Sequence, residues 1–357
     1  MRRRHFLASL VAASTLPTLS WADAGDPAFL AAAREPDGTF ALFGLTAGGA
    51  DLFRIPLPAR GHAAAAHPTR PEAVAFARRP GAFALVIDCA RGIVANRLEA
   101  PEGRHFYGHG AFVHDGDLLV TTENDIATGR GLLGLWSRPD GYARVGEVPT
   151  HGIGPHEVLA LPGDVLAVAN GGIRTDPAQG RDKLNLADMR PSLAYVTPEG
   201  RLLERVELEP DLHLNSIRHL AHWDGTVAFA MQWQGDLPDP APLLGLHRRG
   251  AAPVLATAPL AEQMTLKGYA GSVAMAGGRV AITAPRGNRL HIFGPDGTFL
   301  SALHRDDVCG VARSGQDLIV TDGFGGILDC TKAAGHDSLT SLRKAPRNWD
   351  NHIVAIG

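Results

Sequence analysis

Short runs of apolar residues recur along the whole chain, and glycine, proline or Asp-Gly turns separate them. Short apolar runs that are bounded by turn formers are typical of β-strands, whereas helical periodicity is scarce in this sequence. The 42 glycines and 25 prolines supply the turns that an all-β fold requires. The clearest predicted strands lie at 40–44, 118–122, 165–169, 227–231, 280–284 and 318–322.

The predicted strands follow one repeated order. A glycine turn joins a first strand to a second, a third strand follows, and a Pro-Asp-Gly or Pro-Glu-Gly turn leads to a fourth. These later turns lie at 139–141, 198–200 and 295–297. Four-stranded units of roughly 40–50 residues in tandem are typical of a β-propeller. The last segment, 351–357, is predicted to be a strand that pairs with the first blade and closes the ring.

The amino terminus carries a different pattern. Arg2-Arg3-Arg4-His5-Phe6-Leu7 matches a twin-arginine export motif, an apolar run follows at 6–19, and Ala22-Asp23-Ala24 provides a small-x-small cleavage site. The run is shorter than the roughly 20 apolar residues that span a bilayer. We therefore expect a removable signal peptide at residues 1–24, a periplasmic location and one propeller domain at residues 25–357. Removing 24 of the 357 residues leaves 333, which at about 45 residues per unit predicts seven blades.

Histidines recur at one offset in this repeat. His109 and His156 lie 47 residues apart, and each precedes a turn glycine by seven residues. Arg218 and His219 occupy the matching place in the next unit. Because the first strand of each propeller blade lines the central channel, residues at equal offsets are expected to converge near the axis. The preceding histidines of the two copies, His105 and His151, are expected to form a second tier.

These histidines are candidate metal ligands. Neutral imidazole binds Fe, Cu, Zn or Ni, and the chain has 16 histidines. We predict a site with His109, His156 and His219 as ligands and Glu157 as a carboxylate ligand or as a partner that orients them. Iron and copper are the candidate metals, and the absence of a C-x-x-C-H motif excludes covalent c-type haem. A structural role, in which each histidine bonds a backbone group or an Asp of its own blade, stays open.

One segment, 171–192, is longer than the repeat allows and is expected to join the second and third strands of its blade. Long loops on rigid scaffolds frequently carry function. An anionic ligand such as a carboxylate, a phosphate or a chelated metal is the candidate occupant. The alternative is a solvated loop whose arginines pair with its own aspartates. The candidate ligand-binding residues, on this loop and at the rim, are Arg174, Lys183, Asn185, Arg190, Arg218 and Lys267.

Charge and cysteine content narrow the classes of function. The net charge of −3, which becomes about −5 without residues 1–24, gives no indication of nucleic-acid binding, because that function needs a clustered basic surface. No segment after the leader is apolar enough to span a membrane. Cys89 is predicted to be a core residue, whereas Cys309 and Cys330 are expected in neighbouring units, where a disulfide stays open.

Several motifs together resemble one family. They are His151-Gly-Ile-Gly-Pro-His156-Glu157, Gly171-Gly-Ile-Arg-Thr, Gly180-Arg-Asp-Lys-Leu-Asn-Leu, Met189-Arg-Pro-Ser-Leu and Ser216-Ile-Arg-His-Leu. The chain resembles the DUF1513 family of exported bacterial proteins, to which no function has been assigned, over essentially its whole mature length. The resemblance implies a seven-bladed propeller similar to WD40-like and quinoprotein-like rings. It also implies imelysin-like and dihaem-peroxidase-like proteins as partners in periplasmic iron or other metal handling.

Three hypotheses of function follow. The leading one is a periplasmic propeller that binds a ligand, metal or partner protein at a His/Arg-rich channel rim, within iron or other metal acquisition. The second is an enzyme, either a metal- or quinone-dependent oxidoreductase or a lactonase-like hydrolase, although no catalytic motif is present. The third is a scaffold whose rim docks a partner protein.

Overall fold

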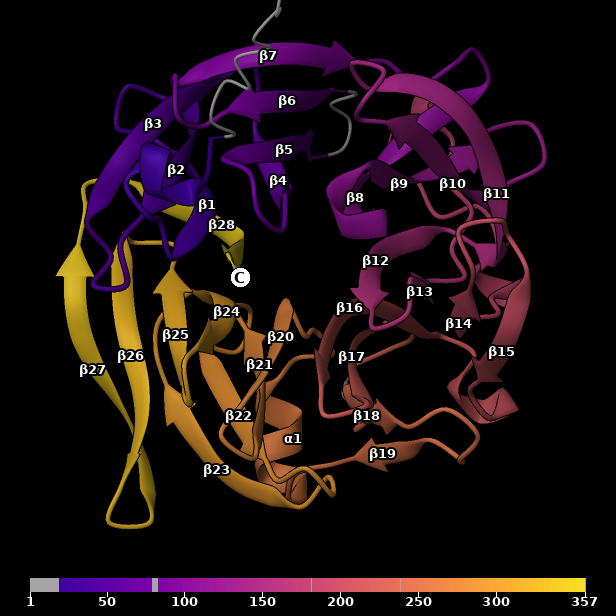
Figure 1. Ribbon diagram of the computed structural model, residues 1–357. Helices are drawn as coiled ribbons and strands as arrows, with labels where there is room; N and C mark the ends of the chain where they lie inside the picture. Colours follow the sequence, from indigo (N-terminus) through magenta and orange to yellow (C-terminus); the bar gives the residue numbers. More distant parts are fainter. Residues whose placement is uncertain (1–18, 79–82, 181, 238, 357) are drawn as a thin grey trace, which may run out of the picture.

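The computed structural model describes residues 19–356, apart from 79–82, 181 and 238. Within these residues the chain forms seven four-stranded antiparallel sheets, arranged as blades around a central axis (Figure 1). The predicted all-β, seven-bladed β-propeller is therefore confirmed. Residues 1–18 of the expected leader lie outside the described residues, and its removal stays a prediction.

Each blade runs from the axis outward. The innermost strands are β28 (Asn348–Ala355), β4 (Gly61–Ala66), β8 (Arg104–Val113), β12 (Pro155–Leu161), β16 (Asn215–Trp223), β20 (Ser272–Ala276) and β24 (Val308–Ser314). The second strands are β1 (Phe29–Arg34), β5 (Glu72–Ala77), β9 (Leu118–Asp125), β13 (Val165–Asn170), β17 (Thr226–Trp233), β21 (Arg279–Ala284) and β25 (Asp317–Asp322).

The outer half of each blade is formed by a third and a fourth strand. The third strands are β2 (Phe40–Leu45), β6 (Ala84–Asp88), β10 (Arg130–Ser137), β14 (Ser192–Val196), β18 (Leu244–His247), β22 (Arg289–Phe293) and β26 (Gly326–Ala333). The outermost strands are β3 (Asp51–Leu57), β7 (Ile93–Leu98), β11 (Ala143–Ile153), β15 (Leu202–Glu207), β19 (Val254–Ala256), β23 (Phe299–His304) and β27 (His336–Lys344).

The helices of the described chain are short; one precedes the first strand and the others lie in connections between strands. None of them is long and apolar enough to cross a membrane. The long loop joins β13 to β14, as expected, and contains two single-turn helices. The helices are η1 (Trp21–Ala24), η2 (His114–Gly116), η3 (Pro177–Gln179), η4 (Leu186–Asp188), η5 (Pro210–Leu212) and α1 (Leu260–Thr265).

The two ends of the chain share one blade. The last strand, β28, pairs antiparallel with β1, with Phe29 opposite Ala355 and Arg34 opposite Asn348. This pairing removes a free sheet edge and closes the ring, as the sequence predicts. The innermost strand of the first blade is therefore the last one in the sequence (Figure 1).

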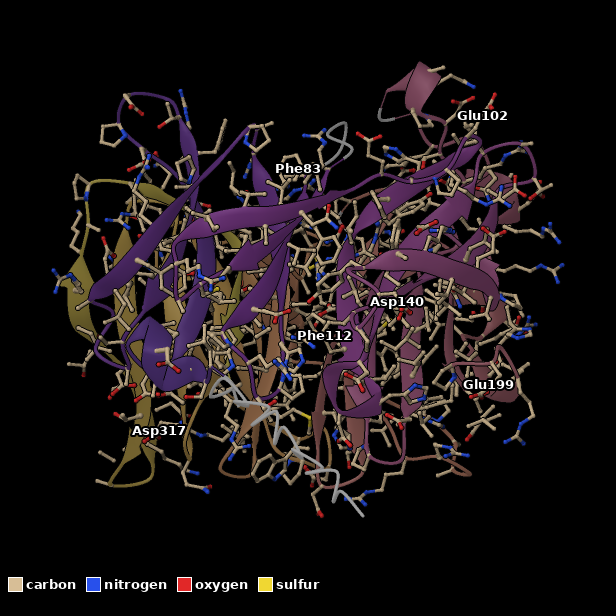
Figure 2. The ribbon with its side chains drawn as sticks, turned by 45° about the horizontal axis from the view of Figure 1, so that its top comes forward. Phe83, Glu102, Phe112, Asp140, Glu199 and Asp317 are labelled. Carbon is tan, nitrogen blue, oxygen red and sulfur yellow. The ribbon has the colours of Figure 1, made fainter. Side chains whose placement is uncertain are left out.

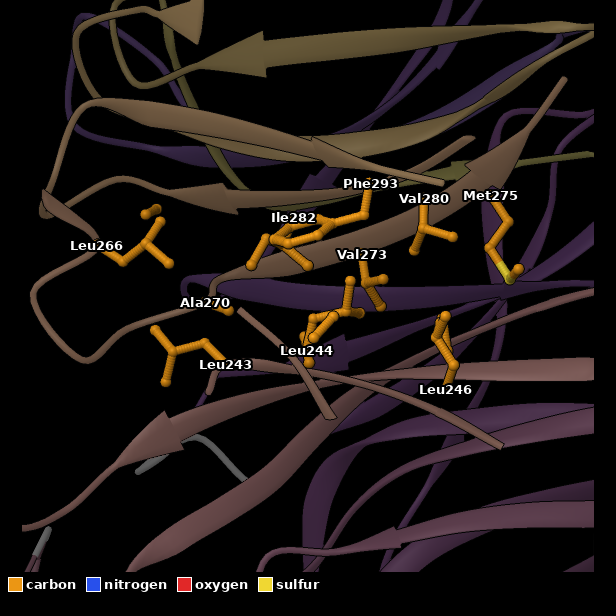
Figure 3. Packing of buried hydrophobic residues seen from close by; sticks show 14 residues of the cluster. Leu243, Leu244, Leu246, Leu266, Ala270, Val273, Met275, Val280, Ile282 and Phe293 are labelled. Carbon is orange, nitrogen blue, oxygen red and sulfur yellow. The ribbon is translucent and has the colours of Figure 1, made fainter. Parts of the chain in front are cut away.

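The hydrophobic core lies between neighbouring blades. Figure 3 shows one of these layers, where Leu244 and Leu246 of β18 face Val280 and Ile282 of β21. Every pair of adjacent blades in the described chain shares such a cluster of buried apolar side chains. Charged residues such as Glu102 and Glu199 lie at the periphery (Figure 2). The core thus holds the blades together and leaves the axis to other side chains.

The cysteines correct one expectation. Cys309 lies in β24 and Cys330 in β26, so they occupy the first and third strands of one blade rather than neighbouring blades. Both are free, as is Cys89, and all three are buried. Burial raises the pKa of each thiol to about 12, so these side chains are core residues rather than thiolates.

Candidate metal centre

Five histidines from five different blades converge on the axis. Each lies on an innermost strand, and neighbouring ring centroids are 4.6–5.8 Å apart. Four of them are buried and the fifth, His156, is partly buried. They are referred to below as the histidine cluster: His62 of β4, His109 of β8, His156 of β12, His219 of β16 and His352 of β28.

Irregularities in the innermost strands direct these side chains toward the axis. The pairing register shifts between Gly61 and Ala64, between Phe106 and Gly110, and between Pro155 and Glu157. Similar shifts accompany His219 in β16 and His352 in β28. A bulge of this kind bends a strand locally and changes the direction of its side chains. The same irregularity in consecutive blades therefore places one imidazole from each at the same height of the channel.

The imidazole nitrogens form two overlapping sets of three. One set is His62, His109 and His156, and the other is His109, His219 and His352. Within each set the candidate ligand atoms lie within 4.8 Å of one another. Two nitrogens that bind one ion at about 2.1 Å can be at most about 4.2 Å apart. Side-chain movements of less than about 1 Å would therefore let either set hold one ion, and His109 belongs to both.

Several nitrogens of the histidine cluster have no hydrogen-bond partner among the described residues. They are Nδ1 of His62, Nε2 of His109, Nδ1 of His156 and Nε2 of His352. An unsatisfied buried polar atom costs about 1–3 kcal/mol. An occupant of the channel that bonds these nitrogens would supply the missing partners.

The cluster is built from neutral imidazoles. Burial, together with the positive charge of neighbouring groups, lowers the pKa of His109, His156, His219 and His352 well below the usual value. Burial also lowers the pKa of His62, although Asp350 opposes this effect. Neutral imidazole is the form that binds a metal ion, so no proton has to leave these rings at neutral pH before binding.

Glu157 lies beside the cluster and fixes one of its rings. Its Oε2 is 3.2 Å from Nδ1 of His219 and accepts a hydrogen bond from the backbone N–H of Leu220 at 3.0 Å. Its Oε1 is 3.9 Å from Nδ1 of His109. Burial raises the pKa of Glu157 to about 8. A carboxylate that receives Nδ1–H of His219 leaves Nε2 of that ring as a lone pair for a ligand.

Asp350 is the second acidic group next to the cluster. It is buried on β28, 3.9 Å from Nδ1 of His62, and Arg78 donates a hydrogen bond to it at 2.9 Å. Arg60 also pairs with this carboxylate. Burial opposes ionisation of Asp350, but His62 and the two guanidinium groups hold its pKa well below the usual range. Asp350 thus balances part of the positive charge around His62.

Two cavities reach the histidine cluster. The first, the arginine mouth, has a volume of 270 Å³; His62, His156 and His219 form its floor. Four cationic residues line its walls: Arg78, Lys183, Arg218 and Arg286. The second, the alanine mouth, has a volume of 440 Å³ and also reaches His109, Glu157, His219 and His352. Alanines of all seven innermost strands line it: Ala63–Ala66, Ala111, Ala160, Ala221, Ala274, Ala312 and Ala355.

The two mouths lie at opposite ends of the channel. The arginine mouth is formed where innermost strands begin and second strands end, and the alanine mouth by later residues of the innermost strands. His219 lines both. The histidine cluster therefore forms a floor that is shared by the two cavities.

The structure brings the four predicted metal-site residues together. His109, His156 and His219 belong to the cluster, and Glu157 contacts His219. The expected second tier does not form: His151 lies on the outermost strand β11, where its Nε2 bonds the carbonyl of Gly200.

Two of the six predicted ligand-binding residues line the arginine mouth, and the other four lie outside it. Lys183 and Arg218 line the arginine mouth, whereas Arg174 lies outside it and donates to the carbonyl of Ala127. Asn185 has a structural contact, because its side chain bonds the backbone of both Arg174 and Gly172. The others lie in separate depressions: Arg190 beside Met189 and His213, and Lys267 beside Leu237 and Met264.

His62 and His352 were not among the predicted ligands. For His62 a signal existed, because it lies 47 residues before His109, the same offset that separates His109 from His156. His352 has no such signal, since it reaches the axis only through the pairing of β28 with β1. Arg78 and Arg286 were missed as well, because each lies just after a second strand with no motif around it.

A ring of seven blades with imidazoles gathered on its axis defines a β-propeller with a candidate ligand site in its channel. The chain belongs to the family described as "Protein of unknown function (DUF1513)", whose family model matches residues 55–356. No match is found among curated proteins.

Solved structures agree with the fold. The chain is similar to Kuenenia stuttgartiensis hydrazine synthase with a TM-score of 0.60 and 13% identity, over 93% of this chain and 98% of that one. It is also similar to a chain of the mitotic checkpoint complex with a TM-score of 0.57 and 12% identity, over 80% and 79% of the two chains. At these identities the likeness concerns the propeller fold alone.

Proposed function

We propose that this protein is a periplasmic metal-binding propeller, which holds an iron or copper ion in the histidine cluster and takes part in metal acquisition. The observation that carries the proposal is the convergence of five neutral imidazoles, four of which have a nitrogen without a hydrogen-bond partner among the described residues. Imidazole nitrogen is a good ligand for both metals.

The surroundings of the cluster support the same function. Metal-bound histidines usually donate their second ring nitrogen to a carboxylate, which raises the basicity of the ligand and fixes the ring. Glu157 is placed for this role toward His219, and Asp350 lies near His62. Two open cavities give an ion access to the cluster without opening the ring.

The cellular part of the proposal depends on the leader and on the family. The twin-arginine motif at Arg2-Arg3 would export the chain already folded, with its metal bound or ready to bind. Imelysin-like and dihaem-peroxidase-like proteins are the proposed partners, and transfer of a metal ion to or from them would make the propeller a carrier or a receptor.

The test is metal uptake by the purified mature protein, measured by elemental analysis after incubation with iron or copper and gel filtration. The expected result is one bound ion per chain, lost in the double variant His109→Ala with His156→Ala. A matched control, His304→Ala with His336→Ala, removes two histidines from outside the cluster and should keep the ion. Unchanged stoichiometry in the first double variant would overturn the proposal.

A further inference from the structure

The arginine mouth is a cationic cavity built from several blades. Arg78 follows β5, Lys183 lies on the β13–β14 loop, Arg218 on β16 and Arg286 after β21, so each comes from a different blade. Among the described residues, no carboxylate lines this cavity. Such a concentration of one charge in a concave site attracts ligands of the opposite sign.

These positive charges influence one another. Burial and the charges of Arg218 and Arg286 lower the pKa of Lys183, as expected for ammonium and guanidinium groups that share one space. Arg78 has a partner in Asp350, and the guanidinium of Arg286 stacks 4.4 Å from the ring centre of Tyr269. The cavity therefore gathers four cationic side chains, of which Arg78 is paired with Asp350.

The neutral walls are held in place by hydrogen bonds. Gln232 donates to the carbonyl of Ala270 at 3.1 Å, and Asn351 donates to the hydroxyl of Tyr269 at 3.1 Å. A wall fixed in this way loses little freedom when a ligand binds, which favours affinity. The volume of 270 Å³ is close to the lower end of the range of about 300–1,000 Å³ for small-molecule pockets, so the occupant must be small.

The floor of the same cavity is the histidine cluster. His62, His156 and His219 line it together with the cationic walls, so one molecule can contact both. A bare divalent ion on this floor would add positive charge beside four cationic side chains. An anion in the cavity above it would relieve that repulsion and supply oxygen ligands to the ion.

We propose that the arginine mouth binds a small oxyanion, with carboxylate or phosphate groups, which caps the metal ion, so that the protein takes its metal as an anionic complex. This inference rests on the proposed metal function for the identity of the metal but not for the anion pocket itself. Guanidinium and ammonium groups recognise carboxylate and phosphate through charge-assisted hydrogen bonds. The cavity thus favours a metal ion in complex with an anion over the bare ion.

The test is calorimetric titration of citrate, and separately of inorganic phosphate, into the metal-free mature protein at constant ionic strength. We expect saturable binding of at least one of them. In the variant Lys183→Gln with Arg286→Gln this binding should weaken by at least about 10-fold, because hydrogen bonds to charged groups are lost. The matched control Arg174→Gln with Arg190→Gln removes two charges from outside the mouth and should bind as the wild type does.

Further titrations separate this inference from the metal proposal. The variant His109→Ala with His352→Ala, neither of which lines the arginine mouth, should lose the metal but still bind the anion. If the wild type takes up no metal yet binds citrate or phosphate, the metal proposal fails and the anion pocket stands. If neither anion binds the metal-free or the metal-loaded protein, or if both double arginine/lysine variants bind equally, the anion pocket is overturned. Binding of citrate alone or phosphate alone identifies the preferred group.

Discussion

The two mouths of the channel open onto the same histidine cluster but are built in different ways. The alanine mouth is lined by successive residues of regular strands, such as Ala64, Ala111, Ala221 and Ala274. The arginine mouth is lined by loops and strand ends, and these carry long cationic side chains. The comparison shows that the regular strands set the width of the channel, whereas the irregular segments at one end set its charge.

Crowding at the axis explains why so many side chains that line the alanine mouth are small and apolar. Seven innermost strands approach one axis, and side chains that point inward compete for the same space. Alanine leaves the channel open, and a larger side chain at several of these positions would fill it. The ends of strands are free of this constraint, since loops lie farther apart and tolerate longer residues.

The largest effect is expected at the residue that both sets of three nitrogens share. His109→Ala removes a ligand from both sets of three nitrogens and should weaken metal binding by more than about 100-fold, beyond the effect of losing a residue that only orients a ligand. His62→Ala and His352→Ala each leave one set intact and should have smaller effects. Competitive titration against a chromophoric chelator measures all three, and equal losses would contradict the shared role of His109.

A smaller effect on metal binding is expected at Glu157, which lines the alanine mouth. Glu157→Gln keeps an oxygen for the N–H of Leu220 but cannot ionise, so it cannot supply the carboxylate that a bound ion beside His219 would favour, and it should weaken metal binding by about 10–100-fold. The matched control is Glu204→Gln, which alters a similar pair, 3.3 Å from His247, outside the channel. The same chelator titration should show no change in the control, and a similar loss in both variants would indicate a general effect on folding.

The smallest effect is expected at His67 in the wall of the alanine mouth, and it concerns the stability of the fold. His67 accepts hydrogen bonds at Nδ1 from the N–H groups of Thr69 and Arg70, and burial lowers its pKa to about 4. The unfolded chain binds this proton more readily, so stability is fully present above about pH 6.5 and falls as the pH drops toward 4. His67 should account for a loss of about 1–2 kcal/mol between pH 7 and pH 5.

Urea unfolding at the two pH values measures this loss. His67→Asn offers an oxygen to the same two N–H groups but does not titrate, so its stability should vary less with pH by that amount. Metal-free protein is used throughout, so that the histidine cluster is in the same state in both proteins. An identical pH dependence in wild type and variant would show that His67 does not contribute.

The sequence was sufficient for the fold because the fold repeats. Runs such as 165–169 and turns such as 139–141 recur in register, and each repeat reinforces the assignment of the others. The same regularity predicted His109, His156 and His219 at one place. It could not predict which charges of the long loop face the axis, because Lys183 and Arg174 belong to one irregular segment whose path depends on its contacts with neighbouring blades.

The pairing of β28 with β1 also affects the order in which the protein folds. A ribosome makes the chain from the amino terminus, so the strand that carries His352 is the last to emerge. Until it docks, the ring is open and the second set of nitrogens lacks one member. Closure of the ring and completion of the cluster are therefore one event, and an ion bound across His109, His219 and His352 would act as a clasp that holds the two ends of the chain together.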